Sequence, residues 1–429
     1  MKKITISLLL LFVASSAAFS QDYKKVRTPL TIFLTIGGES KLDEAKTEID
    51  KLSTDPKGQG KVETYLLQSE IYGSITSNES LKKKYPDAAY RGLEALKKYL
   101  EAEPSAAKYK EDNYVGINAI YNYFFDKGYN LFKAKSWDSA YQNFKPMVEI
   151  GDIMVKNKWT TSTFDTTAYK LAGISAQNAN KEAEAVQYYE KMAALKLKGE
   201  DLEHIYVFLP QYYSKQKNEA EFKKYISLGK ELYPDKPWDQ LEFEYISGNL
   251  SLGDIAKKFD EDLSANTLSS AAAMNYGDFF FNDKKIKDLK PEDKKPYLER
   301  AAKAFSKAFE TDPKNILAGY NAAVSYYVIW GDADDAALAI KGITSEIKSR
   351  RAQADKVALA ASDKAIESLE KAYKLLDEKA DKTNLEKNST KNAAKSLANL
   401  YMWRRDKAKG KAAEYDMYDK KFQFYDKKY

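Results

Sequence analysis

The chain has no cysteine and a single histidine, His204, among its 429 residues. The lack of cysteine excludes disulfides, thiolate metal sites, cysteine nucleophiles and a lipid anchor on an N-terminal cysteine. A Ser-His-Asp triad or a histidine-rich metal site needs its histidine within a constellation, and no second histidine is present. We therefore expect no metal and no cofactor, and we expect His204 to lie on a repeat helix.

Glycine and proline are also scarce, at 19 and 11 residues. Few helix-breaking residues favour a helical protein. The aromatic content of 13% is far too high for a disordered chain. A chain of this length forms either two or three globular domains or one elongated solenoid.

No excess of one charge dominates, because 69 Lys and Arg residues face 63 Asp and Glu residues. The basic runs at residues 82–84, 284–285, 294–295 and 420–421 are mixed with acids and aromatics. This pattern is typical of solvated helix surfaces and not of a polyanion-binding face. We expect no nucleic-acid partner.

Only the N-terminus has an extended apolar run. Met1–Lys3 is positive, residues 4–13 are apolar but too few to span a bilayer, and Ala18-Phe19-Ser20 fits a cleavage site. Residues 1–20 are thus predicted to be a signal peptide cut between Ser20 and Gln21, with an uncleaved anchor helix as the alternative. The expected location is the periplasm, with or without association with the outer membrane, and no integral membrane span is expected.

The stretch from Phe124 to Asp152 carries the main architectural pattern. Gly128 is a small position on the first half of this stretch, and Ala140 and Phe144 lie one turn apart on the second half. This spacing predicts two amphipathic helices whose backbones approach at Gly128 and Ala140, with Phe144 filling the space beside them.

The same offsets recur along the chain, with insertions in the later copies. The small position is Ser69, Gly173, Pro210, Gly277, Ala323 or Ala398. The predicted packing partners are Ala185 and Tyr189 after Gly173, Ala301 and Phe305 with a terminating Pro313 after Gly277, and Ala365 after Ala323. Proline at position 210 is expected to kink its helix.

This order of small and large residues resembles the tetratricopeptide (TPR) repeat. The resemblance implies an all-α fold, a right-handed TPR superhelix of about seven to eight helix hairpins, with helical insertions in the late repeats. The expected parts are a capping hairpin at 21–60, a first half of the array at 61–235, a second half at 236–385 and C-terminal capping helices at 386–429. The Ala- and Lys-rich insertion 331–362 is expected to lengthen its helices or to add a pair, and the tail 415–429 to be a frayed helix. The whole resembles secreted TPR proteins of Bacteroidota.

In such arrays the first helix of each repeat lines a concave groove. The residues expected there are Asn122, Phe125, Tyr129, Phe132, Lys170, Gln177, His204, Gln211, Met274, Phe281, Tyr320 and Tyr327. This set is rich in aromatics and amides, which suit a peptide or a sugar. Lys170 matches one position of the carboxylate clamp of co-chaperone TPR domains, but Ile174 replaces its asparagine, so that activity is not expected.

Three functions follow as hypotheses. The first is a non-enzymatic scaffold that binds a protein or peptide partner of the cell envelope in its groove. The second is a glycan-binding protein similar to TPR-containing starch-binding outer-membrane proteins, which carry the N-terminal cysteine that this chain lacks. The third is an enzyme with an unrecognised pair of acids. Ser139 and Thr166 also lie in short Asp-Ser/Thr triplets that resemble Bacteroidota O-glycosylation sites.

Overall fold

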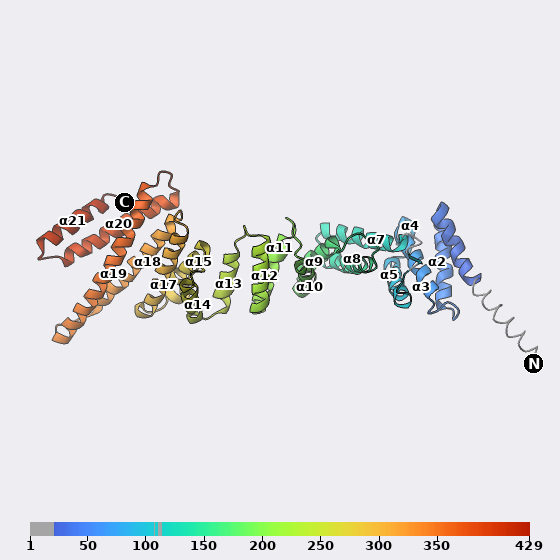
Figure 1. Ribbon diagram of the computed structural model, residues 1–429, viewed down its shortest axis with the longest axis horizontal. Coiled ribbons are helices and arrows are strands. Elements are labelled where there is room, and N and C mark those ends of the chain that lie inside the picture. Colours follow the sequence, from blue (N-terminus) through green and yellow to red (C-terminus); the bar gives the residue numbers. More distant parts are fainter. Residues whose placement is uncertain (1–20, 107, 110–113) are drawn as a thin grey trace, which may run out of the picture. The chain divides into compact units, whose positions relative to one another are not determined.

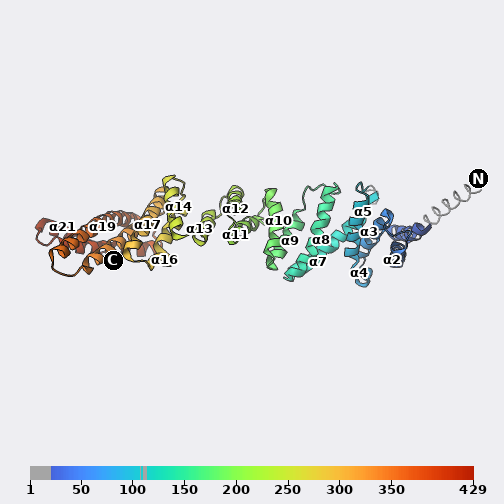
Figure 2. The same cartoon turned by 90° about the horizontal axis from the view of Figure 1, so that it is seen from below.

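The computed structural model describes residues 21–106, 108–109 and 114–429, and every regular element within them is a helix (Figures 1 and 2). The predicted signal peptide and its last residue, Ser20, lie outside the described residues. Gln21 is the first described residue, and residues 21–36 are helical. The expected all-α fold class is confirmed.

The described chain divides into two units, which are considered separately. The first runs to Tyr213 and includes Glu221–Leu228; the second holds Ser214–Ala220 and runs from Gly229 to Tyr429. The helices up to the division are α2 (Glu39–Thr54), α3 (Val62–Thr76), α4 (Glu79–Lys84), α5 (Ala88–Ala102), α7 (Val115–Lys133), α8 (Trp137–Lys156), α9 (Thr166–Asn178), α10 (Glu182–Ala194), α11 (Glu203–Lys215) and α12 (Glu219–Leu232).

The second unit continues with further hairpins and three long helices near its end. Its helices are α13 (Trp238–Asn249), α14 (Leu252–Ser264), α15 (Ser270–Asn282), α16 (Lys284–Lys287), α17 (Pro291–Thr311), α18 (Ile316–Ala339), α19 (Ser345–Glu378), α20 (Asn384–Lys407) and α21 (Ala412–Asp426). Consecutive helices such as α18 and α19, or α20 and α21, lie side by side (Figure 1).

At three of the predicted small positions a glycine lets two helices approach closely. A Cβ atom added to Gly128 would lie 2.7 Å from the ring of Phe144, and one added to Gly277 would lie 2.6 Å from the ring of Phe305. Gly173 has the same relation to the ring of Tyr189 on the next helix. Any larger side chain would push the helices apart, so the spacing read from the sequence is a packing rule of the fold.

The other predicted packing residues also occupy the core. Ala140, Ala185, Ala301 and Ala365, all on second helices, are completely buried. Pro313 follows the end of α17, as expected for a residue that cannot continue a helix.

The predicted insertion at 331–362 lengthens two helices. It extends α18 to Ala339 and starts α19 at Ser345, so that only residues 340–344 form a loop. The resulting helices α18 and α19 have 24 and 34 residues and pack extensively against each other.

The expectation of a frayed tail needs correction. The tail is a regular helix, α21, which packs on α20. Tyr425 is buried in this contact, and its ring stacks on that of Tyr401 with 5.9 Å between the centroids. Pro210 lies buried inside α11 and does not end it, since α11 runs from Glu203 to Lys215. The kink expected at this proline stays a prediction.

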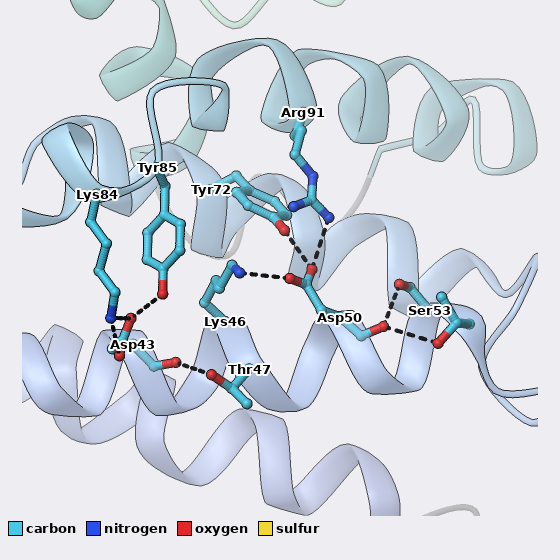
Figure 3. A network of polar contacts seen from close by, with 10 residues as sticks. Asp43, Lys46, Thr47, Asp50, Ser53, Tyr72, Lys84, Tyr85 and Arg91 are labelled. Atoms are coloured by element: carbon cyan, nitrogen blue, oxygen red, sulfur yellow. Dashed lines mark hydrogen bonds and ion pairs between the residues drawn. The ribbon is translucent and has the colours of Figure 1, made fainter.

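A polar network fixes the N-terminal hairpin to the first repeat (Figure 3). The carboxylate of Asp50 on α2 accepts hydrogen bonds from the Tyr72 hydroxyl of α3 and, at 2.9 Å, from Nη2 of Arg91 on α5. Lys46, one turn away on α2, pairs with the same carboxylate at 2.9 Å. Three helices are thus joined at one acidic group.

A second carboxylate, two turns earlier on α2, makes a similar junction (Figure 3). Asp43 accepts a hydrogen bond of 2.6 Å from the Tyr85 hydroxyl and pairs with Lys84 Nζ at 2.9 Å. The hydrogen bonds from Tyr85 and Lys84 lower the pKa of Asp43. The predicted N-terminal capping hairpin is therefore held to the first repeat by polar contacts as well as by its apolar face.

Candidate functional site

One aromatic surface of unit 1 is a row of three rings on α7. Phe125 and Tyr129 stack at 5.6 Å with 8° between planes, and Tyr129 and Phe132 stack at 6.4 Å with 7°. Tyr129 is 40% exposed, and the two flanking rings are partly buried. We call these three residues the α7 aromatic row.

The row follows from helix geometry. Residues 125, 129 and 132 are spaced by four and three positions, so they share one face of α7. Asn122 is exposed one turn before Phe125. Gly128 lies on the buried side against Phe144, and Phe132 also contacts Phe144 edge-on at 6.3 Å. The core contact orients the helix so that the row faces outward.

Tyr189 brings together two further predicted residues, and a third lies close to them. Its hydroxyl donates to Oε1 of Gln177 at 2.8 Å, and its ring meets His204 edge-on at 5.6 Å. Lys170 is near enough to act electrostatically on His204 and forms an ion pair with Asp201. Two candidate residues, one on α9 and one on α11, thus contact one buried tyrosine of α10, and Lys170 lies near the second of them.

His204 is the unusual member of this group. Its Nε2 atom is buried and makes no hydrogen bond within the described residues. Burial lowers the pKa of the imidazole, against the opposing effect of Asp201. Gln211, two turns later on α11, is exposed.

In unit 2 the predicted groove residues pack against neighbouring helices. Met274 and Phe281 of α15 cover the apolar cluster formed with α14 and α17. Tyr327 of α18 accepts a hydrogen bond of 3.2 Å from Asn399 of α20, and Tyr320 packs against the cluster that includes α20. These four side chains are partly buried and do not form a continuous open surface like the α7 aromatic row.

Sequence reasoning missed a cavity of about 380 Å³ in unit 2, between α17, α18 and α19. Its apolar lining includes Ile329, Ala333, Ala336, Val357 and Ala361, while acids and lysines stand around it. The available signal was the run of alanines on both long helices, since facing small side chains leave space between helices.

The two predicted glycosylation sites lie on neighbouring helices, α8 and α9. Ser139 is exposed within α8, and Thr166 is the first residue of α9; their glycosylation stays a prediction. No group of three or more His, Asp and Glu residues in the described ranges is arranged to hold a metal ion. None of the described helices is both long and apolar enough to cross a membrane.

Comparisons with known proteins do not assign a family. No protein-family model matches the chain, and no curated protein matches it. Among solved structures, a human IFIT1 dimer with m7Gppp-AAAA aligns over 99% of this chain and 87% of that chain, at 12% identity and a TM-score of 0.19. A human IFIT1 dimer with PPP-AAAA aligns over 90% and 79%, at 14% identity and a TM-score of 0.17. TM-scores this low support no inference about function, and the function is therefore inferred from the residues of this chain.

Proposed function

We propose that the protein is a non-enzymatic helical-repeat scaffold of the cell envelope, which binds a protein or peptide partner through the first helices of unit 1. The observation that carries this proposal is the α7 aromatic row. Rigid aromatic side chains that stay partly exposed are the residues that most often anchor protein interfaces. The envelope location rests on the predicted signal peptide.

The geometry of the row favours an apolar peptide side chain over a sugar. A sugar ring stacks on an open aromatic face. Phe125 and Phe132 flank the Tyr129 ring in nearly parallel but offset planes, and Lys133 Nζ lies over that ring, 4.9 Å from its centroid. These neighbours reduce the open ring face that a sugar needs, whereas aliphatic and aromatic side chains of a peptide can pack on such a flanked surface.

The residues around Tyr189 extend the surface with polar groups. Gln177 and the Lys170–Asp201 pair offer hydrogen-bond donors and acceptors one repeat further along unit 1. We expect an extended peptide that places an apolar side chain on the row to direct its backbone amides towards these groups.

The experiment is site-specific photocrosslinking of the full chain in an envelope extract. A photoreactive phenylalanine replaces Tyr129, and the control carries it at Phe424 on α21, which is 50% exposed. The expected result is a discrete crosslinked protein at position 129 that is absent at position 424. An excess of the unmodified chain is expected to suppress this product, and an excess of the Tyr129→Ala chain is not. Identical products at both positions, or none at 129, would refute the proposal.

Glycan binding is the alternative, and the exposure of Tyr129, at 40%, is the observation that favours it, because an exposed tyrosine ring can stack on a sugar. Saturable binding of the full chain on a glycan array, abolished by Tyr129→Ala and accompanied by no protein crosslink, would establish it in place of peptide binding.

A further inference from the structure

Four first helices carry a tyrosine three residues after the small position. In three of them the tyrosine hydroxyl donates a hydrogen bond to a carboxylate on the preceding helix. These pairs are Tyr72 with Asp50, Tyr213 with Glu190 at 2.6 Å, and Tyr401 with Glu370 at 2.8 Å. We call this contact the tyrosine tie.

At two of the ties a cation completes the arrangement. Arg91 bonds to Asp50 at 2.9 Å, and its guanidinium carbon lies 4.2 Å from the centroid of the Tyr72 ring. Lys421 bonds to Glu370 at 2.8 Å, and its ammonium lies 5.7 Å from the centroid of the Tyr401 ring. A carboxylate, an aromatic ring and a cation therefore recur as a set, which combines an ion pair with a cation–π contact.

The fourth tyrosine, Tyr326 of α18, has no tie. Its hydroxyl makes no hydrogen bond within the described residues, although Glu299 of the preceding helix α17 is near enough to act on it electrostatically. Burial, and then the charges of Glu299 and Glu367, raise the pKa of Tyr326. In the other three helices the tyrosine hydroxyl is bonded to the carboxylate. Tyr326 and Glu299 instead line the 380 Å³ cavity.

The carboxylates around this cavity differ in how closely they are paired. Three acids line it, together with Lys295 and Lys364. Asp332 is neutralised by Lys294 at 3.0 Å. Lys295 is 4.0 Å from Glu299, too long for a hydrogen bond, and both side chains are about half exposed. Glu299 thus has only this long, half-exposed ion pair, and Glu292 lies beside the same opening.

The remaining wall is apolar. Ile329, Ala333 and Ala336 come from α18, and Val357, Ala360 and Ala361 from α19. A cavity of this size lies at the lower end of the range for small-molecule sites, about 300–1,000 Å³. A ligand that fits this cavity has an apolar part and one polar end.

We propose that this cavity binds an organic cation, a guanidinium or primary ammonium on an aliphatic chain. The cation lies against Glu299 and the ring of Tyr326, in the place that Arg91 and Lys421 take at the completed ties, and the aliphatic chain packs on the alanines of α18 and α19. The same chemistry is found in a free alkylguanidine or alkylamine and in an arginine or lysine side chain of a peptide. This site is in unit 2 and does not depend on the function proposed for unit 1.

The test is calorimetric titration of the full chain with n-butylguanidine and with n-butylurea, which has nearly the same shape but no charge. Saturable binding of n-butylguanidine is expected, with n-butylurea at least about tenfold weaker, because a charge-assisted hydrogen bond is lost. Glu299→Gln and Tyr326→Leu are each expected to weaken n-butylguanidine binding about tenfold or more. Glu190→Gln, which alters the tie to Tyr213 in unit 1, is the matched control and is expected to leave binding unchanged.

Two arms distinguish the source of the cation, and both support the site. Tight binding of n-butylguanidine indicates a free cation, whereas much tighter binding of the capped peptide Leu-Arg-Leu indicates a partner's side chain. No saturable binding of either probe, or binding that Glu299→Gln does not change in a variant with unaltered thermal melting, would overturn the proposal. Binding that appears only after Lys295→Ala or Lys364→Ala would also overturn it, because the chain's own lysine would then fill the place.

Discussion

The hydroxyl of Tyr401 on α20 donates a hydrogen bond of 2.8 Å to Oε1 of Glu370 on α19. The same carboxylate oxygen accepts from Lys421 at 2.8 Å and from Tyr425 at 3.1 Å, both on α21. The three last helices are therefore joined at one acidic group.

Tyr401→Phe tests how much this junction contributes. The substitution removes one hydrogen bond to a charged group and keeps the ring. We expect the free energy of unfolding to fall by at most about 1.5–3 kcal/mol. Urea unfolding measures the total, and hydrogen exchange of α21 locates it. Tyr429→Phe is the control, since its hydroxyl contacts only Asp426 on the preceding turn. Equal effects of the two variants would contradict the assigned role.

Gly128→Ala tests the small position. Its new methyl group would meet the Phe144 ring at 2.7 Å, and overpacking of this kind costs about 1–3 kcal/mol. Gly331→Ala is the matched control, because position 331 lies within α18 with nothing within 4 Å. Alanine there is expected to stabilise the helix by about 0.5–1 kcal/mol. If the packing rule holds, Gly128→Ala lowers the melting temperature and Gly331→Ala raises it.

Asp43 and Lys84 predict a stability window in pH. The folded-state pKa of Asp43 is lowered by the Tyr85 and Lys84 hydrogen bonds. This stabilisation is complete above the unfolded value of about 3.9 and is lost as pH falls through the lower folded value. The pKa of Lys84 is raised by its hydrogen bond to Asp43, so its contribution is present below about 10.4 and is lost as pH rises through the higher folded value. Asp43→Asn should reduce the loss of unfolding free energy at both acidic and alkaline pH, as measured by urea unfolding across the pH range. Asp416→Asn should change neither loss.

His204 predicts a separate step near neutral pH. Burial lowers its folded-state pKa below the unfolded value of about 6.5. Between the folded-state and unfolded-state pKa values of His204, the unfolded chain binds more protons than the folded chain, so the free energy of unfolding rises with pH. The destabilisation is complete at pH values below the folded-state pKa. His204 is the only histidine, which makes the step assignable. Urea midpoints from pH 5 to 8 should show it, and His204→Phe should remove it.

Much of the fold was predictable because it depends on side-chain size at fixed spacing. The relation of Gly128 to Phe144 recurs between Gly277 and Phe305 despite the Lys- and Asp-rich insertion that separates this second pair. The inserted residues form α16 and the start of α17 without changing the contact. The tail was misjudged because its Tyr, Lys and Asp residues look polar in the sequence. Their partner is Glu370 on α19, which is distant in the sequence and bonds to both Tyr425 and Lys421.

The candidate site was predictable only in unit 1. Helical spacing alone places Phe125, Tyr129 and Phe132 on one face. In unit 2 the same rule selects Tyr327, but α20 returns to cover it with Asn399. The cavity beside Tyr326 depends on three helices meeting, and no local pattern contains that information.

Each tyrosine tie joins a hairpin only to the one before it. In every tie the donor and the acceptor belong to neighbouring hairpins, so removing either hairpin leaves a hydroxyl or a carboxylate of the other without its partner. The order of the hairpins is therefore partly specified by these pairs, and the untied Tyr326 marks a place where a pocket can form without the loss of a hydrogen bond.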